Sequence, residues 1–358
     1  MSSEPQRREF LAGSIASVAA LASRAAAEAD AQKSGTTLGL VTYCCRLRGN
    51  VLNRKDASFR LTDPFEFLEH CHKVGAGGMQ VDLGTLELNL ASQLRDRASD
   101  LGVFVEAILS VPKDQGDLDR FTRAMQTAAA AGATAARTTI IPGRRYEYFD
   151  SLEMFREFET RGRRSLELAA PVAEKLKVPL AVENHKDHRN AERVALFEQI
   201  SSEFVGACVD TGNSIALLED PVETVEAFAP WAHSVHLKDQ AVRPYADGFL
   251  LADIPLGQGC LDLKKMVSIL RTRKPNVNFN LELITRDPLQ VPTHSAKYWT
   301  TFPTLPAKDL ARTLRMVRDH SAENLQYVSK LPLDQQAELE DANVKESLDY
   351  ARMELGLR

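Results

Sequence analysis

The chain has 358 residues, of which 44% are hydrophobic and 26% are charged, and its formal net charge is −5. This length accommodates one large barrel of about 250 residues with appendages, or two smaller domains. The mildly acidic balance argues against nucleic acid or an anionic membrane as the main partner. It leaves the nature of a small-molecule substrate open.

Residues 1–31 are predicted to be a twin-arginine signal peptide. Arg7 and Arg8 precede Phe10-Leu11, an alanine-rich apolar run follows over 12–22, and residues 25–31 offer small-residue cleavage sites. The run is too short to span a bilayer stably, which favours a cleaved signal and a periplasmic product without a membrane anchor. The alternative interpretation is that these residues form an amphipathic N-terminal helix or a disordered extension.

The five cysteines do not predict a disulfide framework. Their number is odd, no metal-ligand spacing connects them, and a disulfide between the adjacent Cys44 and Cys45 would strain the backbone. We predict that they are mostly buried thiols.

From residue 36 onward, short apolar runs alternate with amphipathic segments. Runs of this kind are typical of strands that are buried on both faces of a parallel sheet. Eight strands alternating with helices predict a (β/α)₈ TIM barrel over 36–306, followed by a helical extension over 307–358. The predicted strands cover 36–44, 78–83, 103–110, 135–141, 181–185, 205–211, 231–239 and 279–285, and the predicted helices cover 63–74, 88–101, 118–131, 149–176, 192–201, 222–228, 263–272, 310–318 and 334–355.

Two segments depart from this alternation. Residues 240–259 form an insertion after the seventh strand, and residues 286–306 form a long, proline-containing loop after the eighth. Both follow the carboxyl ends of strands, where loops of a TIM barrel cover the substrate. The extension over 307–358 either packs on the barrel or contributes to a homo-oligomer.

Four of the apolar runs carry a side chain that can bind a metal ion: Glu183, Asp210, His236 and Glu282. Taken singly, such residues are often salt-bridged carboxylates, core histidines or turn caps. At equivalent positions of four successive parallel strands, however, they point into one active site. Carboxylates plus one imidazole suit Mn²⁺ or Mg²⁺, with Co²⁺ or Zn²⁺ possible. The sequence therefore predicts one divalent metal ion held by these four residues.

The motifs around these residues carry a resemblance to a known family. Glu-Asn-His at 183–185, Val-Asp-Thr-Gly-Asn at 209–213, Val-His-Leu-Lys-Asp at 235–239 and Leu-Glu-Leu at 281–283 resemble the xylose-isomerase-like TIM-barrel superfamily, over roughly 38–300. That superfamily includes sugar epimerases and isomerases, inosose dehydratases and endonuclease IV. The additional zinc ligands of endonuclease IV have no counterpart here, so DNA repair is not expected.

The resemblance also implies chemistry. In the epimerase members two glutamates move protons on opposite faces of the substrate, so Glu183 and Glu282 are the expected catalytic pair. A divalent ion stabilises an enediolate, which can be reprotonated, lose water or arise by loss of CO₂. We expect an isomerase or epimerase acting on a keto-sugar or sugar acid, with a decarboxylase or dehydratase acting on an oxo-sugar acid or cyclitol as the alternative. A sugar-binding barrel without catalysis is a remote third possibility.

Three further residues are predicted to bind substrate. The epimerase pattern commonly has a histidine three residues after the aspartate ligand, but Asn213 stands there. His185 shares its strand parity with Glu183, and Lys238 shares its parity with His236, so both point inward. His185 would otherwise cap the barrel mouth.

Arg137 is a cation inside the fourth predicted strand. It could pair with a buried acid such as Glu106, because burying it alone is costly. Otherwise its guanidinium offers a fork for a substrate carboxylate or phosphate. Arg46 and Arg286, which follow the first and last strands, could add to that positive charge, and an oxidised sugar acid would then fit the site.

Overall fold

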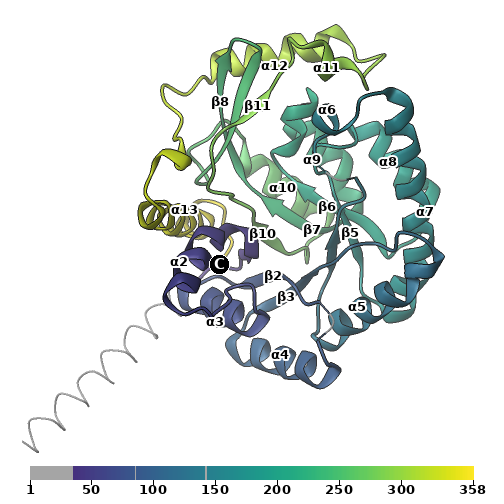
Figure 1. Ribbon diagram of the computed structural model, residues 1–358, viewed down its shortest axis with the longest axis vertical. Coiled ribbons are helices and arrows are strands. Elements are labelled where there is room, and N and C mark those ends of the chain that lie inside the picture. Colours follow the sequence, from purple (N-terminus) through teal and green to yellow (C-terminus); the bar gives the residue numbers. More distant parts are fainter. Residues whose placement is uncertain (1–34, 85, 142) are drawn as a thin grey trace, which may run out of the picture.

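Eight short strands pair side by side into a closed parallel barrel ringed by helices (Figure 1), which confirms the predicted TIM barrel. The computed structural model describes residues 35–84, 86–141 and 143–358, so the predicted signal peptide lies outside the described residues. Around the barrel the order is β1-β10-β7-β6-β5-β4-β3-β2, with β1 pairing with β10 to close it. The strands are β1 (Gly39–Val41), β2 (Gly78–Asp82), β3 (Phe104–Ile108), β4 (Ala136–Thr138), β5 (Leu180–Glu183), β6 (Val205–Asp210), β7 (Ala232–Leu237) and β10 (Phe279–Leu281).

The outer helices begin and end largely where local sequence signals place them. Asp63 and Asp220 each accept hydrogen bonds from two backbone N–H groups of the following turn, and each precedes a proline in the first helical turn. The principal helices are α3 (Pro64–Val74), α4 (Leu88–Leu101), α5 (Leu118–Ala130), α7 (Leu152–Leu176), α8 (Asn190–Ile200), α9 (Pro221–Phe228) and α10 (Leu263–Arg273).

The predicted helix over 149–176 is confirmed as α7, which starts three residues later than predicted, and a separate short helix precedes it. A short α6 (Arg145–Tyr148) ends before Phe149, and α7 begins only after Ser151. Ser151 has extended backbone angles and its side chain accepts a hydrogen bond from the N–H of Met154, which is the geometry of a helix N-cap. Besides α6, two further helices of the described residues were not predicted: α2 (Arg46–Lys55) and α11 (Ala296–Trp299).

The insertion and the last loop build a small sheet of their own. β8 (Asp239–Tyr245) and β9 (Gly248–Ile254) form an antiparallel hairpin, and β11 (Leu289–Val291) pairs with β9. Val242, Leu251 and Val291 are buried in a separate apolar cluster beneath this sheet. The residues of this cluster lie far apart in the sequence, so local patterns did not predict the sheet. In Figure 1 this sheet rises above the barrel beside α12.

The C-terminal segment packs on the barrel. α12 (Ala307–Asp319) lies against β8, and α13 (Leu333–Glu354) lies beside α2 (Figure 1). Glu340 of α13 is buried and accepts hydrogen bonds from the backbone N–H groups of Leu47, at 3.0 Å, and Arg48, at 2.8 Å. These N–H groups belong to the first turn of α2, where no intrahelical partner exists. A distant carboxylate therefore caps α2.

Replacing Glu340 by alanine is expected to lower the free energy of unfolding by about 1–3 kcal/mol, because two buried N–H groups lose their acceptor. Glu338→Ala, an exposed change on the same helix, is the matched control and should stay within about 0.5 kcal/mol of the native value. Urea denaturation of both variants provides the measurement. Equal stabilities for the two variants would contradict the capping role.

The cysteines are free thiols, as predicted. All five belong to the described residues; Cys260 is half-buried and the other four, Cys44, Cys45, Cys71 and Cys208, are buried. Among the helices of the described residues, none has the length and apolarity needed to cross a membrane.

Candidate metal centre

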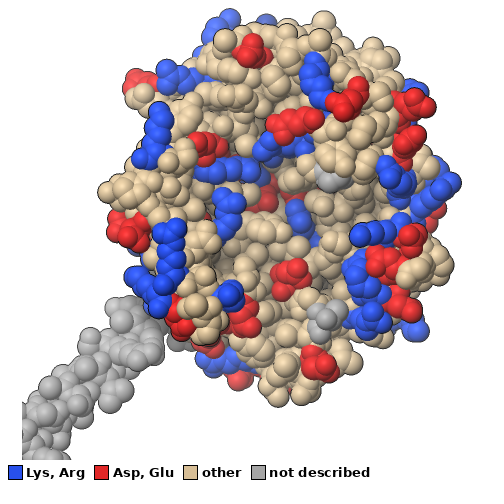
Figure 2. Space-filling model, viewed as in Figure 1, with Lys and Arg blue, Asp and Glu red and all other residues tan. Residues whose placement is uncertain are grey.

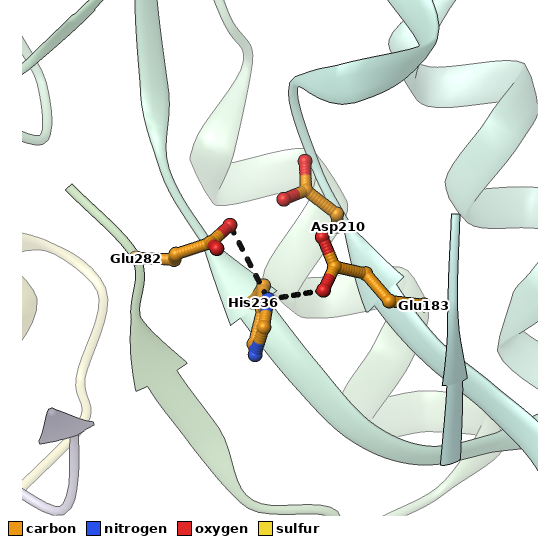
Figure 3. Close-up of side chains that lie close together, drawn as sticks. All are labelled: Glu183, Asp210, His236 and Glu282. Atoms are coloured by element: carbon orange, nitrogen blue, oxygen red, sulfur yellow. Dashed lines mark ion pairs between the residues drawn. The ribbon is translucent and has the colours of Figure 1, made fainter. Parts of the chain in front are cut away.

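The four predicted ligands meet at the carboxyl ends of four neighbouring strands. Glu183 ends β5, Asp210 ends β6 opposite His236 of β7, and Glu282 directly follows β10. One ligand atom from each lies within 4.8 Å of the others. His236 Nδ1 is 3.5 Å from Glu183 Oε2 and 3.3 Å from Glu282 Oε2 (Figure 3). The four side chains identified from the sequence thus come together in space.

Unpartnered buried atoms in this group fit a metal ion. Among the described residues, the buried His236 Nδ1 makes no hydrogen bond, and the buried Asp210 Oδ2 and Glu282 Oε2 lie beside the Lys238 ammonium without an aligned hydrogen bond. Such atoms are rare in folded proteins and need a specific explanation. Three carboxylates and one imidazole nitrogen supply the hard donors that Mn²⁺ or Mg²⁺ prefers, and Zn²⁺ or Co²⁺ accepts the same set. The residues therefore suit one divalent ion.

Arg137 pairs with a buried acid, which was one of the two alternatives, but that acid is Glu183 and not Glu106. Arg137 Nε donates to Glu183 Oε2 at 2.6 Å, and a second nitrogen of the same guanidinium contacts the same oxygen. In the register of β3 with β4, Arg137 lies opposite Ile108, so Glu106 sits deeper in the barrel. Glu106 instead accepts hydrogen bonds from other buried side chains of the barrel interior. The arginine thereby becomes part of the metal centre.

Neighbouring cations keep the two glutamates ionised. Burial alone would raise the pKa of Glu183, but the Arg137 guanidinium outweighs it and holds that pKa well below its usual range. Burial likewise opposes ionisation of Glu282, and Lys238 together with His236 holds its pKa far below normal. Burial raises the pKa of Asp210 to about 7, although Lys238 opposes this effect. Both glutamates are thus carboxylates at neutral pH.

Two lysines contact the metal ligands or a residue bound to them. Lys238 Nζ is 2.9 Å from Asp210 Oδ2 and 2.8 Å from Glu282 Oε2. Lys186 Nζ donates to Asn213 Oδ1, and Asn213 Nδ2 donates to Glu183 Oε1 at 3.2 Å. The structure therefore brings the predicted Lys238, Asn213 and Arg137 to the metal ligands. We refer to Arg137, Lys186 and Lys238 as the cation cluster.

Sequence reasoning missed Lys186. It follows β5 in a loop and has a backbone φ of 60°, so strand parity does not apply to it. Its position three residues after a ligand, in the loop that leaves the barrel mouth, is the signal that could have identified it. Burial, reinforced by the charge of Lys238, lowers the pKa of Lys186 to about 8.

The other residues named from the sequence make no hydrogen bond or ion pair to the four ligands within the described residues. His185 is half-buried, and its Nδ1 has no hydrogen-bond partner within the described residues. Arg286 pairs with Asp253 of β9 at 3.1 Å, while Arg46 is exposed. Figure 2 shows basic and acidic side chains gathered around a hollow near the middle of the face that it presents.

Metal binding should be visible as a gain in stability. At a free Mn²⁺ concentration about 1,000 times its Kd, the free energy of unfolding is expected to rise by about 4 kcal/mol. Thermal unfolding of metal-stripped protein with and without Mn²⁺ checks this. Asp210→Asn, which removes one anionic ligand, should lose most of the response. An unchanged Tm with Mn²⁺, Mg²⁺, Co²⁺ and Zn²⁺ alike would disprove the metal site.

The fold and this site define a class: a TIM barrel whose clustered polar residues lie at the carboxyl ends of its strands. Residues 68–319 match the model of the family described as xylose isomerase-like TIM barrel, and the chain belongs to that family.

The following similar proteins share 28% or less of their sequence with this chain. A 3-oxo-isoapionate decarboxylase of Pectobacterium atrosepticum is 28% identical over 251 residues, which cover 67% of this chain and 83% of that protein. D-psicose 3-epimerase from Clostridium cellulolyticum H10, solved with D-tagatose, superimposes with a TM-score of 0.54 at 13% identity, covering 82% of this chain and 94% of the epimerase. The probable 3-DHS dehydratase AsbF from Bacillus anthracis superimposes with a TM-score of 0.51 at 12% identity. This match covers 80% of this chain and 99% of AsbF. These two structures share the fold.

Proposed function

We propose that the protein is a divalent-metal-dependent lyase that decarboxylates a 3-oxo sugar acid. The observation that carries the proposal is the cation cluster, in which Lys186 has no carboxylate partner among the described residues. A buried ammonium without a counter-ion is costly, and an anionic substrate would supply one. The similarity to a 3-oxo-isoapionate decarboxylase supports the same class of reaction.

The proposed reaction needs no external oxidant or reductant. The bond between the carboxylate carbon and C2 breaks, its electron pair moves toward the C3 carbonyl, CO₂ leaves, and C2 takes up a proton. When bound by Glu183, Asp210, His236 and Glu282, a divalent ion supplies Lewis acidity that lowers the energy of negative charge on the carbonyl oxygen.

The chain's own residues would supply binding and the proton. The ammonium groups of Lys186 and Lys238 lie close together, because both donate to Asn213 Oδ1, Lys238 Nζ at 3.4 Å. Together they can hold the substrate carboxylate by charge-assisted hydrogen bonds. With a pKa of about 8, Lys186 is also suited to protonate the carbon that CO₂ leaves.

Isomerisation or epimerisation of a keto-sugar is the second candidate. It is favoured by Glu183 and Glu282, whose carboxylates flank His236 from two sides (Figure 3). Proton transfer on two faces needs one carboxylate and one neutral acid, whereas Arg137 and Lys238 keep both glutamates ionised. A bound cation would lower both pKa values further. This electrostatic balance favours the lyase.

NMR in D₂O with added Mn²⁺ tests the choice. The full chain is incubated with a panel of 3-oxo sugar acids and ketoses, with Glu183→Gln as the inactive control. Released CO₂ with deuterium in a product shortened by one carbon supports the lyase. Deuterium in a sugar of unchanged length supports the isomerase instead. Saturable binding without exchange or products would indicate a sugar-binding barrel.

A further inference from the structure

A layer of buried polar side chains lies beneath the metal centre. Gln80 of β2, Glu106 of β3, Ser234 of β7 and Asn280 of β10 are all 0% exposed. Glu106 Oε2 accepts hydrogen bonds from all three neighbours, at 2.9 Å from Gln80 Nε2, 2.6 Å from Ser234 Oγ and 2.9 Å from Asn280 Nδ2. Polar groups are costly in a barrel interior that aliphatic side chains could fill. This layer therefore calls for a role beyond packing.

Gln80 connects the layer to the metal centre. Its Oε1 lies 2.8 Å from His236 Nε2, while its Nε2 donates to Glu106. An amide has one accepting end and one donating end, and Glu106 Oε2 is an acceptor on which three donors converge. Glu106 thus fixes the NH₂ end of Gln80 toward itself and leaves the carbonyl end facing His236.

This orientation determines the tautomer of His236. A carbonyl oxygen at 2.8 Å requires the imidazole hydrogen on Nε2. In the neutral ring, which is the form that binds a cation, Nδ1 then carries the lone pair, and it faces Glu183 Oε2 and Glu282 Oε2 at 3.5 and 3.3 Å. The unpartnered Nδ1 is the nitrogen left to bind a cation.

We propose that Gln80, held in place by Glu106, is a positioning residue that fixes His236 in the tautomer able to bind the divalent ion through Nδ1. The inference rests on the metal site of the proposed function. It adds two residues on strands β2 and β3, which supply none of the four ligands. Partners that orient a metal-bound histidine typically change metal affinity by 10- to 100-fold when they are removed.

Two measurements on the full chain test the proposal: Mn²⁺ affinity by calorimetry, and the ¹⁵N shifts of the His236 ring in metal-free protein at a pH where this ring is neutral, assigned by comparison with His236→Asn. Gln80→Leu removes the contact. Gln80→Asn keeps an amide but is one methylene too short to reach both partners, which preserves the test if the leucine variant does not fold. Both are expected to bind Mn²⁺ about 10- to 100-fold more weakly and to lose the pure Nε2–H tautomer.

The matched control is Asn280→Ala, which removes another donor to Glu106 but leaves the Gln80–His236 contact in place. Its affinity and its ring shifts should match those of the native protein. Glu106→Gln retains a carbonyl acceptor for Gln80, so this variant should keep much of the native Mn²⁺ affinity. Unchanged tautomer and affinity in both Gln80 variants would overturn the proposal. If the native protein binds no Mn²⁺, the proposed function fails, and the ring shifts still test the Gln80 contact separately.

Discussion

Glu183→Gln is expected to reduce kcat/KM by at least about 10³-fold. The change preserves shape but removes one anionic metal ligand, and loss of a positioned acid–base group or of metal-based charge stabilisation costs factors of this order. It also removes the counter-ion of Arg137, which is buried beside Glu183 with its guanidinium on Oε2. Because an uncompensated buried charge is costly, the variant should also be less stable by about 3–5 kcal/mol.

Activity, bound metal and Tm must be measured together for this variant. Glu87→Gln makes the same chemical change at an exposed position and should leave all three unchanged. Native turnover with metal still bound would exclude Glu183 from the chemistry. If metal and turnover disappear together and both return at high Mn²⁺, then Glu183 acts as a ligand and not as a proton carrier.

Lys186→Met is expected to lower kcat/KM for a sugar acid by about 10²- to 10³-fold. Removing one partner of a buried charge pair costs about 2–5 kcal/mol, and methionine keeps the length of the side chain while removing its charge. A neutral ketose should bind the variant about as well as it binds the native protein. Equal losses for charged and neutral sugars would show that Lys186 does not recognise a carboxylate.

The pKa of Lys186 predicts how kcat/KM depends on pH. The pKa of Lys186 is lowered to about 8, chiefly by burial, so the ammonium is present below pH 8 and is lost as the pH rises through that value. Therefore kcat/KM for the acid should fall above about pH 8. Lys186→Arg, which stays charged, should shift this fall to higher pH. A native profile that is flat between pH 7 and 10 would contradict the assignment.

Several parts of this protein could be read from local sequence. Each barrel strand is a short apolar run, because both of its faces are buried, and Asp63 and Asp220 mark helix starts by capping exposed N–H groups. The four ligands stood out because a carboxylate or imidazole at the end of such a run is costly without a partner. Their equivalent positions in successive strands then placed them together.

The partnerships inside the site were decided by tertiary structure alone. Whether Arg137 meets Glu183 or Glu106 depends on the register of β3, β4 and β5, which no single segment specifies. Lys186 reaches the site through a left-handed loop residue, to which strand parity does not apply. The β8–β9–β11 sheet and the Gln80–Glu106 layer join residues that lie far apart in the chain. The sequence by itself determined which residues end the strands. Closure of the barrel decided which of those residues touch, because contacts between strands depend on strand pairing and stagger and not on local conformational preference.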